Sequence, residues 1–145
     1  MIDRQALLDS VPKGLYIDGQ WRDSSDGTTL EVDNPATGEV LATIASATPA
    51  DGMAALDAAV AAQASWAKVA PRERGEILRT AYEKIVERTE EFALLMTLEM
   101  GKPLAEARGE VAYGAEFFRW FSEEAVRIHG RYSVAPNGAS RLLTM

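Results

Sequence analysis

Residues 98–125, LEMGKPLAEARGEVAYGAEFFRWFSEEA, decide the fold of this chain. The run opens on Gly-Lys-Pro at 101–103, where the glycine ends one helix and the proline begins the next. Apolar residues then recur at alternating spacings of three and four, which predicts one helix over 103–129, about 40 Å long. The apolar seam of this helix consists of Leu104, Ala107, Val111, Gly114, Phe118, Phe121, Ala125 and Ile128.

A second apolar stripe, Tyr113, Phe117 and Trp120, lies on the flank of this seam. A helix with two apolar faces has to be covered on both. The preceding helices can cover one face, but the sequence offers no cover for the other. Because burial of a Phe or Trp side chain stabilises by about 1.5–3 kcal/mol, we expect the chain to be the first part of a larger fold or an obligate oligomer.

Composition and charge narrow the class of protein. The 145 residues are 47% hydrophobic and 26% charged, which suits one globular domain. The net charge of −7 argues against nucleic acid or an anionic membrane surface as a partner, because both need a basic face. The longest strongly apolar run, FALLM at 92–96, is too short to span a membrane. With no secretory signal at 1–10, we expect a cytoplasmic protein.

The chain has no cysteine, so these residues can form no disulfide, thiolate metal site or thiol nucleophile. Its one histidine, His129, is expected at the C-terminal end of the long helix, where it suits the helix dipole. A lone histidine in that position is more typical of a surface residue than of a catalytic base. The sequence therefore offers no thiol nucleophile and only this one histidine as a candidate base for a Ser-His-Asp triad.

The N-terminal third alternates in the manner of short strands. Residues 1–14 form a polar arm with a short helical tendency. The runs 15–22, 29–34 and 39–45 are separated by Asn, Asp, Gly and Pro, which favour turns. We therefore predict a small antiparallel β unit of three strands over 15–46.

After Thr48 the apolar spacing changes from 2 to about 3.6, which predicts helices over 49–67, 71–88 and 89–100. The segment is therefore expected to be mainly α-helical, with helices over 49–129. The stretch 140–145 begins a strand that stops mid-pattern, with no partner expected in this chain. The apolar faces of the three helices are Met53, Leu56, Val60 and Ala64; Leu78, Ala81, Tyr82, Ile85 and Val86; and Phe92, Leu95, Met96 and Leu98.

Taken in order, these motifs resemble the N-terminal portion of the aldehyde dehydrogenase superfamily. The matching motifs are YIDGQW at 16–21, NPATGEVL at 34–41, a Pro-started alanine-rich helix, and the stretch 98–125. The resemblance covers the chain from about Gly14 to Met145. The runs GKPLAEA and FFRWFSEEA are most similar to succinate-semialdehyde dehydrogenases.

The resemblance implies a much longer α/β parent with a Rossmann-type cofactor domain that binds NAD or NADP. Residues 15–130 would form the N-terminal part of that domain, and 131–145 would begin an oligomerisation strand. The cysteine nucleophile, the general base and the cofactor-binding strands would follow residue 145, so this chain alone should be inactive. The full-length parent would be a homo-oligomer, a dimer or tetramer, that oxidises the small-molecule aldehyde succinate semialdehyde to succinate through a cysteine thioester.

The resemblance also implies a structural monovalent cation, held by the Glu99 carboxylate and the backbone carbonyls of Val32 and Asp33. Oxygen ligands of this kind suit a hard cation. The plainer interpretation is that Glu99 caps the next helix or pairs with Lys102.

The same resemblance suggests that Tyr113 and Phe117 line the tunnel by which the aldehyde reaches the nucleophile. An aromatic stripe at helical spacing more commonly belongs to the hydrophobic core.

Two other functions stay open: a dehydrogenase for a different aldehyde, such as a betaine or fatty aldehyde, and a self-standing, non-catalytic helical module whose aromatic helix docks a partner.

Overall fold

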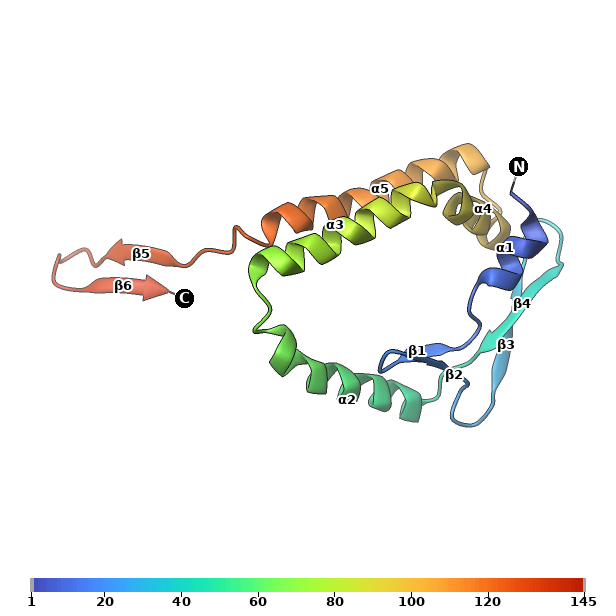
Figure 1. Cartoon of the computed structure of the whole chain (residues 1–145), viewed down its shortest axis with the longest axis horizontal. Coiled ribbons are helices and arrows are strands. Elements are labelled where there is room, and N and C mark those ends of the chain that lie inside the picture. Colours follow the sequence, from blue (N-terminus) through green and yellow to red (C-terminus); the bar gives the residue numbers. More distant parts are fainter. Residues whose placement is uncertain (1, 145) are drawn as a thin grey trace.

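Figure 1 shows a computed structural model of the chain, which describes residues 2–144. The elements in chain order are α1 (Arg4–Ser10), β1 (Leu15–Ile17), β2 (Gln20–Arg22), β3 (Thr29–Asp33), β4 (Val40–Ala45), α2 (Pro49–Trp66), α3 (Pro71–Glu87), α4 (Thr89–Met100), α5 (Leu104–Glu124), β5 (Arg131–Val134) and β6 (Arg141–Thr144). The ribbon forms a ring, with α3 and α5 side by side along one side and α2 along the opposite side (Figure 1). The segment is mainly helical with small antiparallel sheets, as expected.

Two separate hairpins replace the predicted three-stranded unit. The run 15–22 is not one strand, because Asp18 and Gly19 both adopt positive φ and reverse the chain between β1 and β2. Positive φ at both central residues is the geometry of a two-residue hairpin turn. β3 and β4 form the second hairpin in a sheet of their own, with a bulge between Val32 and Asp33. The chain reversal within 15–22 therefore coincides with Gly19, a residue type that favours turns.

Helix α2 begins where the sequence predicts it, with Pro49 at its first position and a reciprocal capping box between Thr48 and Asp51. Its predicted apolar face is not buried, since Met53, Leu56 and Val60 are all exposed. Within residues 2–144, this face of α2 is therefore left largely open to solvent.

The core lies where α5 packs between α3 and α4. Ala93, Ala107 and Val111 are buried at its centre. The partly buried side chains that surround them are Ile85, Phe92, Met96 and Leu104.

Within residues 2–144, no helix combines the length and apolarity needed to cross a membrane.

The buried line of α5 differs from the predicted seam. It continues through Ala115 and Ser122, whereas Gly114 and Phe121 of the predicted seam are exposed. The physical reason is a close approach of α3: a Cβ built on Gly75 would stand 2.7 Å from the Ser122 carbonyl oxygen. Such proximity leaves room only for small side chains, so α5 turns its small residues toward α3 and its rings outward.

Helix α5 also ends earlier than predicted, at Glu124 instead of residue 129. The Arg127 N–H closes a tight turn onto the Glu124 carbonyl, and the β-branched residues Val126 and Ile128 lower the helix propensity beyond it. His129 therefore lies outside the helix, and Ile128 is exposed.

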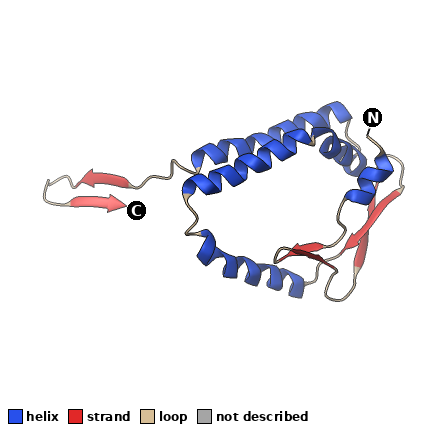
Figure 2. Cartoon of the chain, viewed as in Figure 1, coloured by secondary structure: helices blue, strands red, loops and turns tan. Residues whose placement is uncertain are grey.

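A third hairpin, β5 and β6, extends away from the ring (Figure 2). The strand predicted near the C-terminus therefore has its partner within the chain, and the expectation of a missing partner is wrong. The turn between the strands carries Asn137 and Gly138, with positive φ at the glycine, and Asn-Gly is a hairpin signal in the sequence. All eight residues of the two strands are exposed.

Candidate functional site

Glu99 and Val32 line one cavity of about 220 Å³. Glu99 lies on the last turn of α4, and Val32 lies on β3 next to the bulge. A bulge interrupts the ladder of backbone hydrogen bonds at its position. Asp33, the third residue predicted for a cation site, is not among the residues that line this cavity.

Lys13 of the N-terminal arm lines the same cavity, although no local pattern in the sequence indicates it. Its ammonium group donates hydrogen bonds to the carbonyl oxygens of Leu8 and Val11, at the C-terminal end of α1. The Lys13 carbonyl in turn accepts a bond of 2.8 Å from the Ala45 N–H of β4. Lys13 and Glu99 therefore line the same cavity from two different parts of the chain, the N-terminal arm and α4.

The two plainer roles considered for Glu99 are not seen. Lys102 pairs with Glu110 of α5 instead. Helix α5 has Pro103 at its N-cap and no side-chain cap. Within residues 2–144, no three acidic or histidine side chains gather into a metal cluster. Any cation here would therefore combine the single Glu99 carboxylate with carbonyl oxygens, a donor set that a hard monovalent cation accepts.

Tyr113 and Phe117 lie on an open face of α5. Their rings meet edge to face, with centroids 5.0 Å apart and an interplanar angle of 88°. They are 68% and 48% exposed, so nothing within residues 2–144 buries them as core. With Glu116, Trp120 and Phe121 they line a shallow cavity of about 370 Å³.

A larger cavity of about 530 Å³ adjoins this face, since Trp120 and Phe121 line both. Trp66 of α2 and Ile77 of α3 form its other apolar walls. Arg74 also lines it, with a buried Nε that has no hydrogen-bond partner among the described residues. The aromatic end of α5 is thus part of a continuous apolar surface that faces outward.

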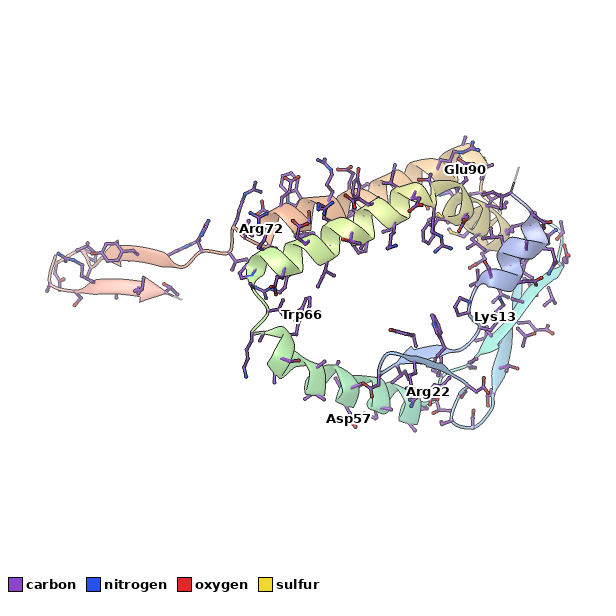
Figure 3. The ribbon with its side chains drawn as sticks, viewed as in Figure 1. Lys13, Arg22, Asp57, Trp66, Arg72 and Glu90 are labelled. Atoms are coloured by element: carbon purple, nitrogen blue, oxygen red, sulfur yellow. The ribbon has the colours of Figure 1, made fainter. Side chains whose placement is uncertain are left out.

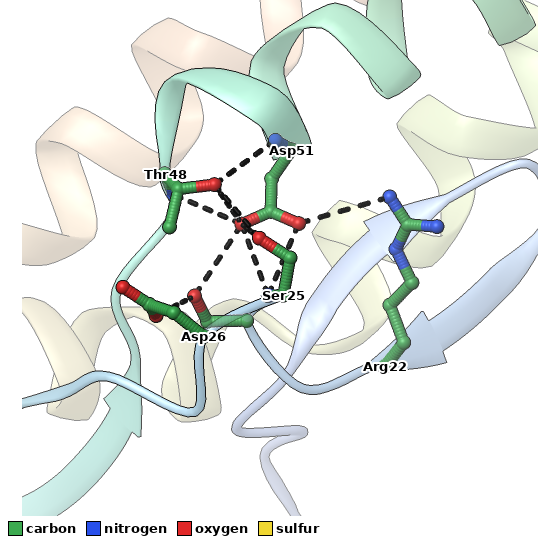
Figure 4. Close-up of polar contacts among 6 residues, drawn as sticks. Arg22, Ser25, Asp26, Thr48 and Asp51 are labelled. Atoms are coloured by element: carbon green, nitrogen blue, oxygen red, sulfur yellow. Dashed lines mark hydrogen bonds and ion pairs between the residues drawn. The ribbon is translucent and has the colours of Figure 1, made fainter.

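The most buried charged group forms a polar cluster at the start of α2 (Figure 4). Asp51 is only 3% exposed. Its carboxylate accepts hydrogen bonds from the Thr48 N–H at 2.9 Å and from the Ser25 N–H at 3.2 Å. These hydrogen bonds, and above all the one from the Thr48 N–H, lower the pKa of Asp51 to about 2.

This cluster ties the loop after β2 to α2. The hydroxyls of Ser24 and Ser25 also donate to Asp51, and the Arg22 guanidinium lies 4.0 Å from it. The cap formed by Thr48 and Asp51 is a local feature, because the two residues are three positions apart. The sequence did not reveal the contacts to the loop, because they join residues 26 or more positions apart.

Comparison with known proteins adds to this geometry. The aldehyde dehydrogenase family model matches residues 21–145. Succinate-semialdehyde dehydrogenase from Paenarthrobacter nicotinovorans is 67% identical over 104 residues, which are 72% of this chain and 23% of that protein. Glutarate-semialdehyde dehydrogenase from Pseudomonas putida is 47% identical over 115 residues, which are 79% of this chain and 24% of that protein.

Among solved structures, betaine aldehyde dehydrogenase from Staphylococcus aureus in complex with NAD+ has a TM-score of 0.88 at 31% identity. The match covers 92% of this chain and 27% of that one. This chain thus spans about a quarter of the length of these relatives. The family match extends over all but the first 20 residues. The chain belongs to the aldehyde dehydrogenase family.

Proposed function

We propose that this chain is the N-terminal segment of an NAD(P)-dependent dehydrogenase that oxidises succinate semialdehyde to succinate. The observation that carries the proposal is the 67% identity to a succinate-semialdehyde dehydrogenase, of which the chain covers 23%. The outward-facing rings of α5 support the same conclusion, because a larger protein would bury them.

The chemistry would reside in the part that follows this segment. A cysteine thiolate there would attack the aldehyde carbon, a hydride would pass to the nicotinamide of NAD or NADP, and water would hydrolyse the thioester to the acid. The 145 residues contain no cysteine, so we expect the segment alone to be inactive. The carboxylate of the substrate would also need a cationic side chain from the later part.

The segment's own contribution would be structural. Residues 15–130 would form the shoulder of the cofactor-binding domain, and the β5–β6 hairpin would begin the oligomerisation strands of a dimer or tetramer. The exposed apolar side chains of that hairpin, including Tyr132 and Leu143, support an interface role. The cytoplasm stays the predicted compartment.

Two site hypotheses belong to this function. Tyr113 and Phe117 would form part of the wall of the aldehyde tunnel, which is supported by their exposed, edge-to-face rings. Glu99, with carbonyls from the bulge at Val32 and Asp33, would hold a structural monovalent cation, which is supported by the cavity that Glu99 and Val32 share.

Two alternatives keep a specific observation in their favour. Oxidation of glutarate semialdehyde or betaine aldehyde would agree with relatives named for those substrates. A helical interaction module would use the apolar surface around Trp120 to dock a partner.

A steady-state assay tests the proposal. The full-length protein that carries this segment is purified and offered succinate semialdehyde, glutarate semialdehyde and betaine aldehyde, each with NAD and with NADP. We expect reduced cofactor to form, with the highest kcat/KM for succinate semialdehyde, and no turnover by residues 1–145 alone. A higher kcat/KM for another aldehyde would show that succinate semialdehyde is not the substrate. The absence of cofactor reduction with all three aldehydes would overturn the dehydrogenase proposal.

A further inference from the structure

The chain contains two asparagines, and both make the same contact with the backbone that follows them. The Asn137 side-chain oxygen Oδ1 accepts a hydrogen bond of 3.0 Å from the Ala139 N–H. The Asn34 Oδ1 accepts one of 2.9 Å from the Ala36 N–H. A bond of this kind folds the side-chain amide back toward the peptide unit that follows the asparagine. The two side chains therefore have the same local arrangement.

The two asparagines differ in the backbone nitrogen that comes next. Gly138 has an N–H and no side chain, and among residues 2–144 nothing lies within 4 Å of a Cβ built on it. Pro35 has no N–H, because its nitrogen closes the pyrrolidine ring. A backbone nitrogen has to lose its proton before it can attack a neighbouring amide carbon. Only Asn137 therefore has a nucleophile beside it.

The turn at Asn137 is also open to water. Asn137 and Gly138 are exposed, whereas Asn34 is only 7% exposed. Figure 3 shows the far end of the β5–β6 hairpin well away from the side chains of the ring. The Gly138 N–H donates a hydrogen bond of 2.8 Å to the Ala135 carbonyl, which has to open before the nitrogen reacts. Exposed loop tips open in this way at little cost in free energy.

Two hydrogen-bond donors lie where negative charge would develop. The Ala139 N–H already donates to the Asn137 Oδ1, the oxygen that becomes anionic when the amide carbon is attacked. The Arg141 guanidinium donates to the Gly138 carbonyl at 3.3 Å. A positive charge is thereby held beside the nitrogen that has to become an anion, and it favours that form.

We propose that Asn137 is a site of spontaneous deamidation in the folded protein. The Gly138 nitrogen gives its proton to hydroxide and forms a bond to the Asn137 Cγ. The Cγ–Nδ2 bond breaks, and ammonia leaves after taking a proton from water, so that a five-membered imide remains. Water then opens the imide at either carbonyl carbon and leaves aspartate or isoaspartate. The reaction consumes water, releases ammonia and adds one negative charge to the turn.

The test maps the modification in the full-length protein during storage in neutral and in mildly alkaline buffer, below the Tm. Mass spectrometry of proteolytic peptides locates each amide that has become a carboxylate. A methyltransferase specific for isoaspartate labels that product independently. Asn34 is the control within the same molecule. Asn137→Gln is the matched variant, because its amide carbon lies one methylene farther from the Gly138 nitrogen.

We expect both products to accumulate at Asn137, faster at the higher pH, with none at Asn34 and none in Asn137→Gln. Arg141→Gln should slow the reaction by about two- to fivefold, the effect of one exposed charge at short range. A rate that does not change in Arg141→Gln would refute the role of Arg141.

Two results would overturn the proposal itself. If Asn137 is modified in denaturant but not in the folded protein, the turn protects the side chain. If Asn34 and Asn137 are modified at equal rates, the Gly138 nitrogen is not the nucleophile. Neither result depends on dehydrogenase activity.

Discussion

The ring of Pro35 lies against Gly101: a Cβ built on Gly101 would stand 3.2 Å from the Pro35 Cγ. Gly101 ends α4 in the left-handed region, with φ of 73°. The contact joins the NPATG turn to the Gly-Lys-Pro motif, which lie 66 positions apart in the sequence. It thereby holds the bulged end of β3 beside the last turn of α4, so that Val32 and Glu99 share one cavity.

Replacement of Gly101 by alanine should destabilise the protein for two reasons. A side chain in the left-handed region costs about 1–2 kcal/mol, and the added Cβ would also press on the Pro35 ring. Gly27→Ala is the matched control, because Gly27 has the same φ of 73° with no atom within 4 Å of the added Cβ. We expect thermal melting of the full-length protein to show a larger loss for Gly101→Ala. Equal losses would mean that the contact with Pro35 contributes nothing.

Substitution of two helical glycines by alanine should change the stability of the protein in opposite directions. Gly75→Ala would place a Cβ 2.7 Å from the Ser122 carbonyl oxygen, and overpacking of this kind costs about 1–3 kcal/mol. Gly109, in the second turn of α5, has nothing within 4 Å of an added Cβ, so Gly109→Ala should gain about 0.5–1 kcal/mol from helix propensity. Thermal melts of the full-length protein measure both. A stable Gly75→Ala variant would contradict the close packing of α3 on α5.

The Asp51 cluster should lose its contribution in acid. The folded-state pKa of about 2 lies below the usual aspartate value of about 3.9, so the ionised carboxylate favours the folded state above pH 3.9. That contribution should decline as the pH falls from about 4 to 2, where the carboxylate becomes protonated in the folded state as well.

The measurement is the difference in Tm between wild type and Asp51→Asn across this pH range. The two proteins should differ at neutral pH and converge toward pH 2. Asp57→Asn, on the exposed surface of the same helix, should follow the wild type throughout. A constant difference between wild type and Asp51→Asn would show that the charge of Asp51 is not what stabilises the loop.

The helix boundaries in the first two thirds of the chain could be predicted because their signals are local. Thr48 caps α2, Pro71 opens α3 and Gly101 ends α4, each with its own short-range chemistry. The β5–β6 hairpin differs from the prediction of an unpaired strand, because the turn at Asn137 and Gly138 pairs that strand with β5. The residues that signal the turn were present in the sequence.

The orientation of α5 could not be predicted from periodicity, because the helix is apolar on two sides. The choice between Phe121 and Ser122 as the buried residue depends on how closely α3 approaches, and Gly75 decides that from another helix. The candidate cation site shows the same limit. The resemblance selected Glu99 and Val32, which do share a cavity, but Lys13 enters it only through tertiary contacts of the arm. Cation binding itself stays a prediction.

The central claim is that the rings on the outward face of α5 are covered by polypeptide that follows this segment. Binding of a hydrophobic-surface dye tests it, with the 145-residue chain, its Phe117→Glu/Trp120→Glu variant and the full-length protein compared at equal concentration. We predict strong binding and self-association for the wild-type segment, weaker binding for the variant, and little binding for the full-length protein. A segment that is monomeric, melts cooperatively and binds no dye would contradict the claim.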